Sequence, residues 1–252
     1  MKTVLLLGDI TGRSRVALRM LSSVLEKLGH EVLMLPTALI SNTLNLGMHE
    51  SLDTTDYLLR SLETWEKLGM RYDLAYIGYI TGMEQAEKLC DVADRLREKG
   101  VPVVLDPILG DNGKKYNSVS DSQAAGMQML CRHVDMITPN LTEAALLLDK
   151  AYAPERGKDD ALALTERGCD VLITSAKDEQ GGDAIIGCEK GRMFEIPFER
   201  VPGHKWGTGD LFTALLMDGI LAGKSLETAA RNAGLHVAAQ LRGEEESLLP
   251  EQ

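Results

Sequence analysis

The chain has 252 residues, a formal net charge of −11, and acidic and basic side chains that are interspersed along its length. This charge argues against a nucleic-acid surface or a patch for anionic membranes, and it favours a small-molecule ligand. No linker or change in composition divides the sequence, so residues 1–252 are predicted to form one α/β domain.

Short apolar runs alternate with longer amphipathic stretches up to residue 175. The apolar runs predict buried parallel strands at 3–8, 31–36, 74–79, 101–107, 134–140 and 170–175. The amphipathic stretches predict helices near 15–28, 54–68, 83–99, 120–132, 141–149 and 158–168. This alternation predicts a doubly wound, mainly parallel central sheet that is flanked by helices on both faces.

The pattern changes after residue 175. Residues 183–201 are typical of a short antiparallel meander that turns at Glu189–Gly191, and two helices near 208–222 and 226–241 follow. The N-terminal apolar run is too short for a signal peptide, and no segment approaches a membrane span, so we expect a cytoplasmic protein. The cysteines are far apart and form no CxxC pair, which indicates reduced thiols.

Polar residues follow the ends of nearly all the predicted strands. In a parallel sheet the ligand crevice lies beyond the carboxyl ends of the strands. Each of these residues alone fits ordinary turn chemistry or helix capping, but their joint presence at one edge indicates a binding site. They are Gly8, Asp9, Ser41 to Thr43, Tyr79, Asp106, Asp111, Thr138, Asn140, Thr174 and Ser175.

The segment GTGDLFTALL, residues 207–216, places two glycines and an aspartate at the start of an apolar helix. The free N–H groups and the dipole of a helix N-terminus favour an anion, and glycines let the anion approach closely. Asp210 would repel a phosphate, but it could accept the proton of a hydroxyl that attacks the phosphate. The alternative is that Asp210 only complements the helix dipole.

Asp106 and Glu143 are candidates for holding Mg²⁺ through water, because this ion keeps several of its waters. Glu143 could instead be a first-turn helix acid behind Asn140. A phosphate cradle, a base and a metal are the parts that phosphoryl transfer to a hydroxyl requires. The P-loop motif is not matched, because GDITGRS and GILAGKS each have one residue too few between their two glycines. The Rossmann motif is not matched either, because GTGDLF has Phe212 in place of a third glycine.

Four motifs, in this order, resemble the pyridoxal kinases of the ribokinase-like superfamily. They are DPILGDNGKKY, ITPNLTEAALLL, VLITS and GTGDLF, and the resemblance extends to LPTALISN and IGY, so that it covers most of residues 1–240. The GTGD segment is typical of the superfamily. The pattern DPxxGDxGKxY followed by TPNxxE is similar to the vitamin B6 kinases and to the related hydroxymethylpyrimidine kinases.

The resemblance implies ATP-dependent phosphorylation of the 5′-hydroxymethyl group of a B6 vitamer, with Mg²⁺, a candidate role for a monovalent cation such as K⁺, and a homodimer. Asp210 would be the base, the N–H groups of Gly207, Thr208 and Gly209 would hold the γ-phosphate, and Asp106 and Glu143 would organise Mg²⁺. The acceptor pocket would contain Asp9, Ile10, Thr11, Ser41, Asn42, Thr43 and Tyr79. The ATP-binding residues would be Asp111, Lys114, Tyr116, Thr138, Asn140, Thr174 and Ser175, with a flap at Asp111 to Tyr116.

Two departures from the family pattern touch the acceptor pocket. The first loop, GDITGRS, is shorter than usual, and Thr43, Leu44 and Asn45 stand where many relatives have a histidine and threonine pair. Two alternatives therefore stay open: a kinase for another hydroxymethyl heterocycle or a sugar, and a ligand-binding protein that has lost turnover on a kinase fold. The intact Gly207 to Asp210 segment speaks against the second of these.

Overall fold

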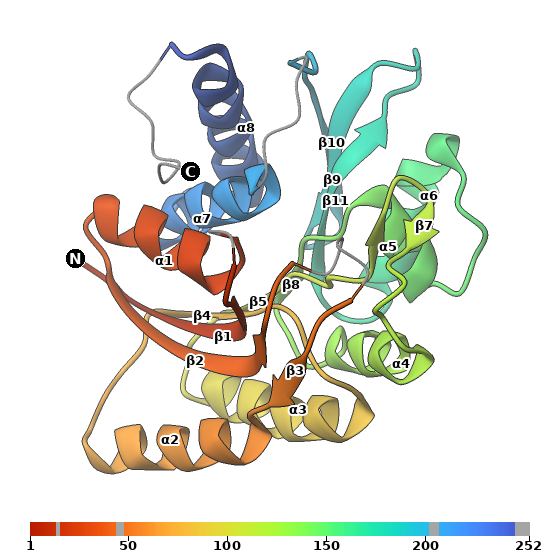
Figure 1. The fold of residues 1–252 in the computed structure, drawn as a ribbon. Coiled ribbons are helices and arrows are strands. Elements are labelled where there is room, and N and C mark those ends of the chain that lie inside the picture. The colour runs from red at the N-terminus through yellow and green to blue at the C-terminus, as the bar shows by residue number, and fades with distance from the viewer. Residues whose placement is uncertain (14–15, 44–47, 202–206, 245–252) are drawn as a thin grey trace.

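The sheet positions all the candidate residues. The computed structural model describes residues 1–13, 16–43, 48–201 and 207–244. Within these residues a nine-stranded sheet has the order β11-β10-β9-β8-β5-β4-β1-β2-β3 (Figure 1). The predicted parallel strands are confirmed as β1 (Thr3–Thr11), β2 (Glu31–Ile40), β4 (Leu74–Ile77), β5 (Val103–Leu105), β8 (Met136–Ile137) and β9 (Asp170–Lys177).

The two edges of the sheet are antiparallel. Strands β10 (Asp183–Glu189) and β11 (Arg192–Pro197) form the predicted meander beside β9. At the other edge, β3 (Ser51–Asp53) pairs with the end of β2. The sequence did not indicate β3, because its three residues are exposed and carry no alternation of apolar and polar side chains.

Helices cover both faces of the sheet, as predicted (Figure 1). Alternate residues of a strand point to opposite faces, so Leu5 and Leu7 join one apolar core while Val4 and Leu6 join the other. The first core packs against α2 (Thr55–Lys67), α3 (Met83–Glu98), α4 (Asp121–Leu130), α5 (Leu141–Leu147) and α6 (Gly157–Thr165). The second core packs against α1 (Leu18–Lys27), α7 (Thr208–Leu221) and α8 (Leu226–Arg242).

Three further sequence expectations concern the chain as a whole. The cysteines are buried with free thiols. Among the helices that the structure describes, none has both the length and the hydropathy that crossing a bilayer requires. The assignment of residues 1–252 to one domain stays a prediction.

The β10–β11 hairpin contains a glycine that is covered by an aromatic ring. Gly187 pairs with Phe194, and a Cβ at Gly187 would overlap the ring carbons. We expect Gly187→Ala to lower the free energy of unfolding by about 1–3 kcal/mol, because Phe194 must leave its position. Urea unfolding would measure this change.

A matched control lies on α8, where a Cβ at Gly234 would meet Ile185 Cδ1 at 3.6 Å, an ordinary contact. Gly234→Ala should stabilise the protein by about 0.5–1 kcal/mol, because glycine is disfavoured inside helices. Equal unfolding midpoints for the two variants would contradict the packing of the hairpin.

Candidate active site

The N-terminus of α7 offers a place for an anion. Gly207 is the N-cap residue, with φ of 82°, and has no side chain that could occupy the first N–H groups of the helix. A Cβ at Gly207 would lie 2.5 Å from Met20 Cε, so both the backbone conformation and the space require glycine. Gly209 is exposed, and a Cβ there would meet nothing within 4 Å. The first turn is therefore open to an approaching phosphate.

Asp210 lies in this first turn and is held by the loop before α1. Its Oδ2 accepts a hydrogen bond of 2.9 Å from the backbone N–H of Ala17. Ala17 has φ of 52° and ψ of −134°, a conformation that a residue with a Cβ rarely adopts, which indicates local strain. Burial raises the pKa of Asp210 to about 6, and the bond from Ala17 opposes this rise. Asp210 is therefore mostly ionised at neutral pH and still basic enough to accept a proton.

Asp9 approaches Asp210 from β1. Gly8 pairs with Pro36, whereas Asp9 pairs with Ala38, so the register shifts by one residue at this point. Burial, and then the negative charge of Asp210, raise the pKa of Asp9 to about 7. The prediction that β1 ends at Gly8 was wrong, because the bulge lets pairing continue through Thr11. Asp9, Ile10 and Thr11 therefore belong to the strand.

Asp106 and Glu143 are brought together at the ends of β5 and β8. Asp106 directly follows β5, and the side chains of Tyr76 and Thr138 lie near its carboxylate. Burial, and then the charge of Asp210, raise the pKa of Asp106 to about 7. Glu143 is 5% exposed, and burial together with the charge of Asp106 raises its pKa well above the ordinary value. Carboxylates from distant parts of the sequence thus interact at one point.

Glu143 lies in the first turn of α5, as the alternative interpretation held, and it also caps this helix. Its Oε2 accepts from Asn140 N at 2.8 Å, while Asn140 Oδ1 accepts from Glu143 N at 3.0 Å, which completes a capping box. Its Oε1 accepts from Leu109 N at 3.2 Å, which ties the helix to the segment after β5. Each carboxylate oxygen has a second lone pair, so capping leaves room for a water-mediated metal contact.

The donor set fits Mg²⁺ better than an ion that needs a protein cage. Among the described residues, no group of three or more His, Cys, Asp and Glu side chains could hold a metal ion. Mg²⁺ needs only one or two carboxylates together with waters and substrate phosphates. Asp106 is partly buried and Glu143 is buried, and their two carboxylates repel each other beside an open helix N-terminus, which is a suitable place for this hard dication.

The loop after β2 lies beside the end of β1. Gly12 N donates to Ile40 O at 2.7 Å, and a Cβ at Gly12 would lie 2.9 Å from Ser41 O. Ser41 Oγ donates to Asn42 Oδ1 at 2.7 Å, and Asn42 Nδ2 donates to Met48 O at 2.8 Å. These side chains therefore close the loop that leads to β3, next to Thr43.

Tyr79 lies beyond the carboxyl end of β4, and its carbonyl oxygen accepts a hydrogen bond of 2.6 Å from Thr37 Oγ1 on β2. It is 4% exposed and packs with Ala38, Ile40 and Ile108. Ser14 of the first loop, and Leu44 and Asn45 of the second departure, lie outside the described residues. The structure thus brings Asp9, Ser41 and Tyr79 to the carboxyl ends of neighbouring strands, and their roles in binding stay predictions.

The residues predicted to bind ATP lie around β8, α5, β9 and the segment after β5. Thr138 follows β8, and Asn140 caps α5. Thr174 and Ser175 lie inside β9, which continues to Lys177 instead of ending at Ser175. The strand is longer than predicted because β10 pairs with it as far as Lys177, which lies opposite Asp183.

The predicted flap is a hairpin that the sequence analysis did not recognise. Strands β6 (Gly110–Asp111) and β7 (Lys114–Lys115) are joined by Asn112 and Gly113, both with positive φ. Asn-Gly is a common two-residue hairpin turn, so the signal was present in the sequence. Gly113 N donates to Thr142 Oγ1 at 2.8 Å, and Asn140 Nδ2 donates to Gly110 O at 2.8 Å. The hairpin is therefore tied to the start of α5.

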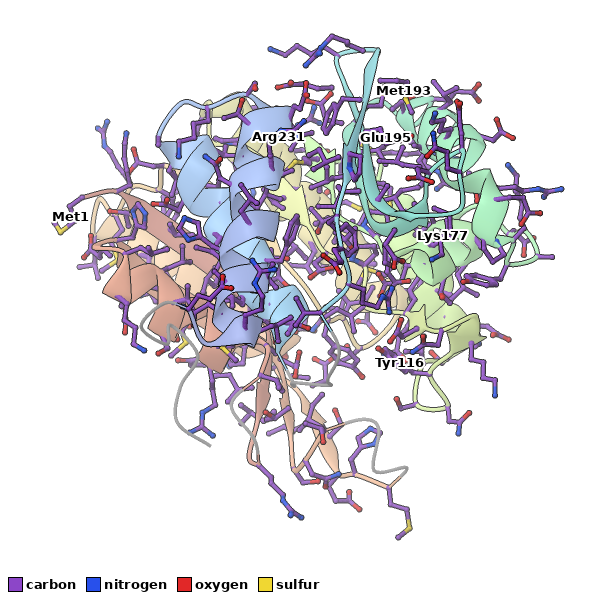
Figure 2. The ribbon with its side chains drawn as sticks, turned by 90° about the horizontal axis from the view of Figure 1, so that it is seen from above. Met1, Tyr116, Lys177, Met193, Glu195 and Arg231 are labelled. Carbon is purple, nitrogen blue, oxygen red and sulfur yellow. The ribbon has the colours of Figure 1, made fainter. Side chains whose placement is uncertain are left out.

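Tyr116 follows this hairpin and is partly buried. In Figure 2 it lies beside the green part of the chain, on the opposite side of the molecule from Met1. Burial raises its pKa, so the phenol stays protonated. Lys114 and Asp111 are exposed on the hairpin. The closing of this segment over a nucleotide stays a prediction.

Sequence reasoning missed two groups at the site. The first is the N–H group of Ala17, which no side-chain pattern reveals. The second is Tyr76, whose phenol lies near Asp106 although the residue belongs to the apolar run LAYIGY. In such a run an aromatic residue indicates a core position, and its hydroxyl gives no further signal.

The comparisons with known proteins define the class. The model of the phosphomethylpyrimidine kinase family matches residues 26–248, and the chain belongs to this family. A pyridoxine/pyridoxal/pyridoxamine kinase of Bordetella avium is 28% identical over 222 residues, which are 82% of this chain and 73% of that protein. The pyridoxal kinase of Arabidopsis thaliana is 28% identical over 58% of this chain, and the match spans only 50% of that protein.

Solved structures agree with the fold prediction of a ribokinase-like sheet. A protein from Bacteroides thetaiotaomicron, named after the phosphomethylpyrimidine kinases and crystallised with pyridoxal, has a TM-score of 0.87 and 29% identity, covering 98% of this chain and 89% of its own. The pyridoxal kinase of Lactobacillus plantarum has a TM-score of 0.83 and 25% identity, covering 97% of this chain and 89% of its own. The predicted resemblance to the pyridoxal kinases is therefore confirmed.

Proposed function

We propose that this protein is an ATP-dependent kinase that phosphorylates the 5′-hydroxymethyl group of a B6 vitamer. The observation that carries the proposal is the position of Asp210, a partly buried carboxylate at the open N-terminus of α7. A base and a phosphate cradle at one helix end are what the transfer of a phosphoryl group to a hydroxyl requires. The relatives named as pyridoxal kinases support the choice of acceptor.

In this mechanism Asp210 accepts the proton of the acceptor hydroxyl as the hydroxyl oxygen attacks the γ-phosphorus of ATP. The bond between this phosphorus and the β–γ bridging oxygen breaks, and ADP leaves. The N–H groups of Gly207, Thr208 and Gly209 stabilise the charge on the transferred phosphoryl group. The hydrogen bond from Ala17 holds Asp210 in place for the acceptor.

The nucleotide side of the site is formed by residues around β8, α5 and β9. Thr138, Asn140, Thr174 and Ser175 would lie along the triphosphate, together with Asp111 and Lys114 on the β6–β7 hairpin and Tyr116 directly after it. Asp106 and Glu143 would hold Mg²⁺ through water, and the bound ion would neutralise charge on the phosphates. K⁺ is a further candidate cofactor. The acceptor would lie between Asp9 to Thr11, Ser41 to Thr43 and Tyr79.

A panel of acceptors tests the proposal. ADP formation from Mg-ATP would be measured with pyridoxal, pyridoxine, pyridoxamine, hydroxymethylpyrimidine and ribose. Turnover with a B6 vitamer supports the proposal. ATP and a vitamer should also raise the melting temperature additively, because ligands that bind the native state stabilise it. Thermal shifts without turnover on any acceptor would instead identify a ligand-binding protein.

A second candidate is the phosphorylation of hydroxymethylpyrimidine. The match to the phosphomethylpyrimidine kinase family model and a relative from Rhizobium meliloti named hydroxymethylpyrimidine/phosphomethylpyrimidine kinase favour it. Both acceptors carry a hydroxymethyl group on an aromatic heterocycle, so Asp210 would act in the same way. Turnover confined to the pyrimidine in the acceptor panel would select this candidate.

The assembly state and location complete the proposal. A homodimer is supported by the exposed cross-strand pair Leu39 and Leu52, which are 41% and 60% exposed on the open edge formed by β2 and β3. Sedimentation at several protein concentrations would measure the mass. A cytoplasmic location fits the use of ATP.

A further inference from the structure

Gln85 is a buried glutamine in the first turn of α3, and it is 3% exposed. Its Nε2 donates to Thr37 O on β2 at 2.9 Å and to Thr55 Oγ1 at the start of α2 at 2.8 Å. Its Oε1 accepts from Thr81 N at 2.9 Å. Both N–H groups of the amide are therefore used, and one side chain joins β2, α2 and the segment between β4 and α3.

The residue of β2 that accepts this bond is the extra residue of the bulge between β1 and β2. Pro36 and Ala38 pair with successive residues of β1, so the pairing skips Thr37 between them. A bulge bends its strand and re-aims the side chains beside it. Gln85 thus bonds the backbone at the point of the bulge, next to the part of β1 that carries Asp9.

Thr37 also connects the bulge with Tyr79. Its hydroxyl is completely buried and donates to Tyr79 O at 2.6 Å. Strand β1 lies between β2 and β4, so this bond reaches across β1 to the segment after β4. Tyr79 in turn packs with Ala38 and Ile40, which follow the bulge. The bulge and the segment that carries Tyr79 are therefore fixed relative to each other.

A second buried amide bonds the same segment. Gln123, in the first turn of α4, is 5% exposed, and its Nε2 donates to Ile80 O at 2.8 Å. All three residues from Tyr79 to Thr81 thus have a backbone group bonded to a buried side chain. This arrangement limits the positions that the Tyr79 ring can take beside the predicted acceptor residues of β1.

We propose that Gln85 is a positioning residue, whose amide fixes the β2 bulge and the segment after β4 in the arrangement that acceptor binding requires. This inference rests on the proposed function of the site. Gln85 contacts no substrate in this role, and it acts through Thr37 and Thr81. Thr54 N also donates to Thr37 O, at 3.2 Å, so loss of the amide loosens the bulge and leaves its carbonyl with one donor.

Gln85→Met tests the inference, because methionine has a side chain of similar length and cannot donate a hydrogen bond. Steady-state rates would be measured with pyridoxal, pyridoxine and pyridoxamine. We expect kcat/KM for the vitamers to fall by about 10–100-fold, mainly through a higher acceptor KM, because small displacements of positioning groups have effects of this size. The KM for ATP and the calorimetric affinity for Mg-ADP should stay unchanged.

The expected split between the substrates separates positioning from stability. A purely structural role of Gln85 would lower the melting temperature and leave the acceptor KM of the folded protein unchanged. An acceptor KM equal to that of the wild type in Gln85→Met would overturn the inference.

Thr37→Val and Thr37→Ser supply a second test, which decides the question if Gln85→Met does not fold. Valine keeps the shape of threonine and removes the donor to Tyr79 O, so the acceptor KM should rise as in Gln85→Met. Serine keeps the hydroxyl, so Thr37→Ser should retain an acceptor KM close to that of the wild type. Equal acceptor KM values in these two variants would overturn the inference.

The matched control is Gln128→Met. Gln128 is a partly buried glutamine on α4, and its Nε2 donates to Leu146 O on α5 at 3.0 Å. This variant loses a hydrogen bond of the same kind but should keep the acceptor KM of the wild type. Melting temperatures of all variants would measure the loss of stability. An equal rise of the acceptor KM in Gln128→Met and Gln85→Met would show a general effect on the fold and overturn the inference.

The two hypotheses fail in distinguishable ways. If the wild-type protein turns over no B6 vitamer, the proposed function fails, and the inference fails with it. If the wild type turns over a vitamer and Gln85→Met retains its acceptor KM, the function stands and the role of Gln85 is refuted.

Discussion

Asp210→Asn is expected to lower kcat by about 10²–10⁴-fold, because the amide cannot accept the proton of the attacking hydroxyl. The amide has nearly the same shape, and its oxygen can still accept the hydrogen bond from Ala17 N. The fold and the affinity for Mg-ADP should therefore stay close to those of the wild type. Rates of ADP formation, calorimetric ADP binding and the melting temperature would measure the three quantities.

A suitable control lies on the same helix. Asp218 is two turns further along α7 and bonds His30 Nε2 at 2.9 Å, away from the open N-terminus. Asp218→Asn should retain kcat. If Asp210→Asn turned over acceptor nearly as fast as Asp218→Asn, Asp210 would have no role as the base.

The pH dependence of kcat/KM should show an acid limb near the pKa of Asp210, which burial raises to about 6. Below this pH the carboxylate gains a proton and cannot act as a base, so activity falls by about tenfold per pH unit. Above this pH the carboxylate is ionised and activity is retained. Steady-state rates between pH 4.5 and 8 would locate the limb.

The neighbouring carboxylate provides a test of the same electrostatics. Besides burial, the charge of Asp210 contributes to the raised pKa of Asp9, which is about 7. Asp210→Asn removes this charge, so the pKa of Asp9 should fall, while burial still holds it above its ordinary value. NMR titration of the carboxyl group in both proteins would measure this pKa. A pKa of Asp9 that stays in place, or rises, would contradict the electrostatic coupling of the two side chains.

Much of the fold could be predicted because its signals are local. A buried parallel strand is indicated by a short apolar run, and an amphipathic helix by apolar residues that repeat every three to four positions. Both signals are therefore visible within a short segment of the sequence. Polar residues at strand ends then share one edge of the sheet through topology alone. The exceptions are β3 and the β6–β7 hairpin, whose strands are too short to show a period.

The candidate site was predictable only in part. The segment Gly207 to Asp210 and the acids Asp106 and Glu143 are visible in the sequence, because glycines and carboxylates at element ends carry specific chemistry. The structure adds that Glu143 is also a helix cap, through a capping box that the residues Asn140 and Glu143 at this spacing allow. One residue can thus satisfy both interpretations.

The sequence by itself determined the strand and helix periods, the sheet edge that carries the polar residues, and the helix N-terminus with its aspartate. Only the tertiary structure decided that β1 continues past Asp9, that Ala17 N bonds Asp210, and that Asp106 and Glu143 lie close enough to repel each other. These features depend on a bulge between two strands, on a strained loop, and on neighbouring strands that bring the residues after their ends together. Such contacts join residues far apart in the chain, and no local pattern encodes them.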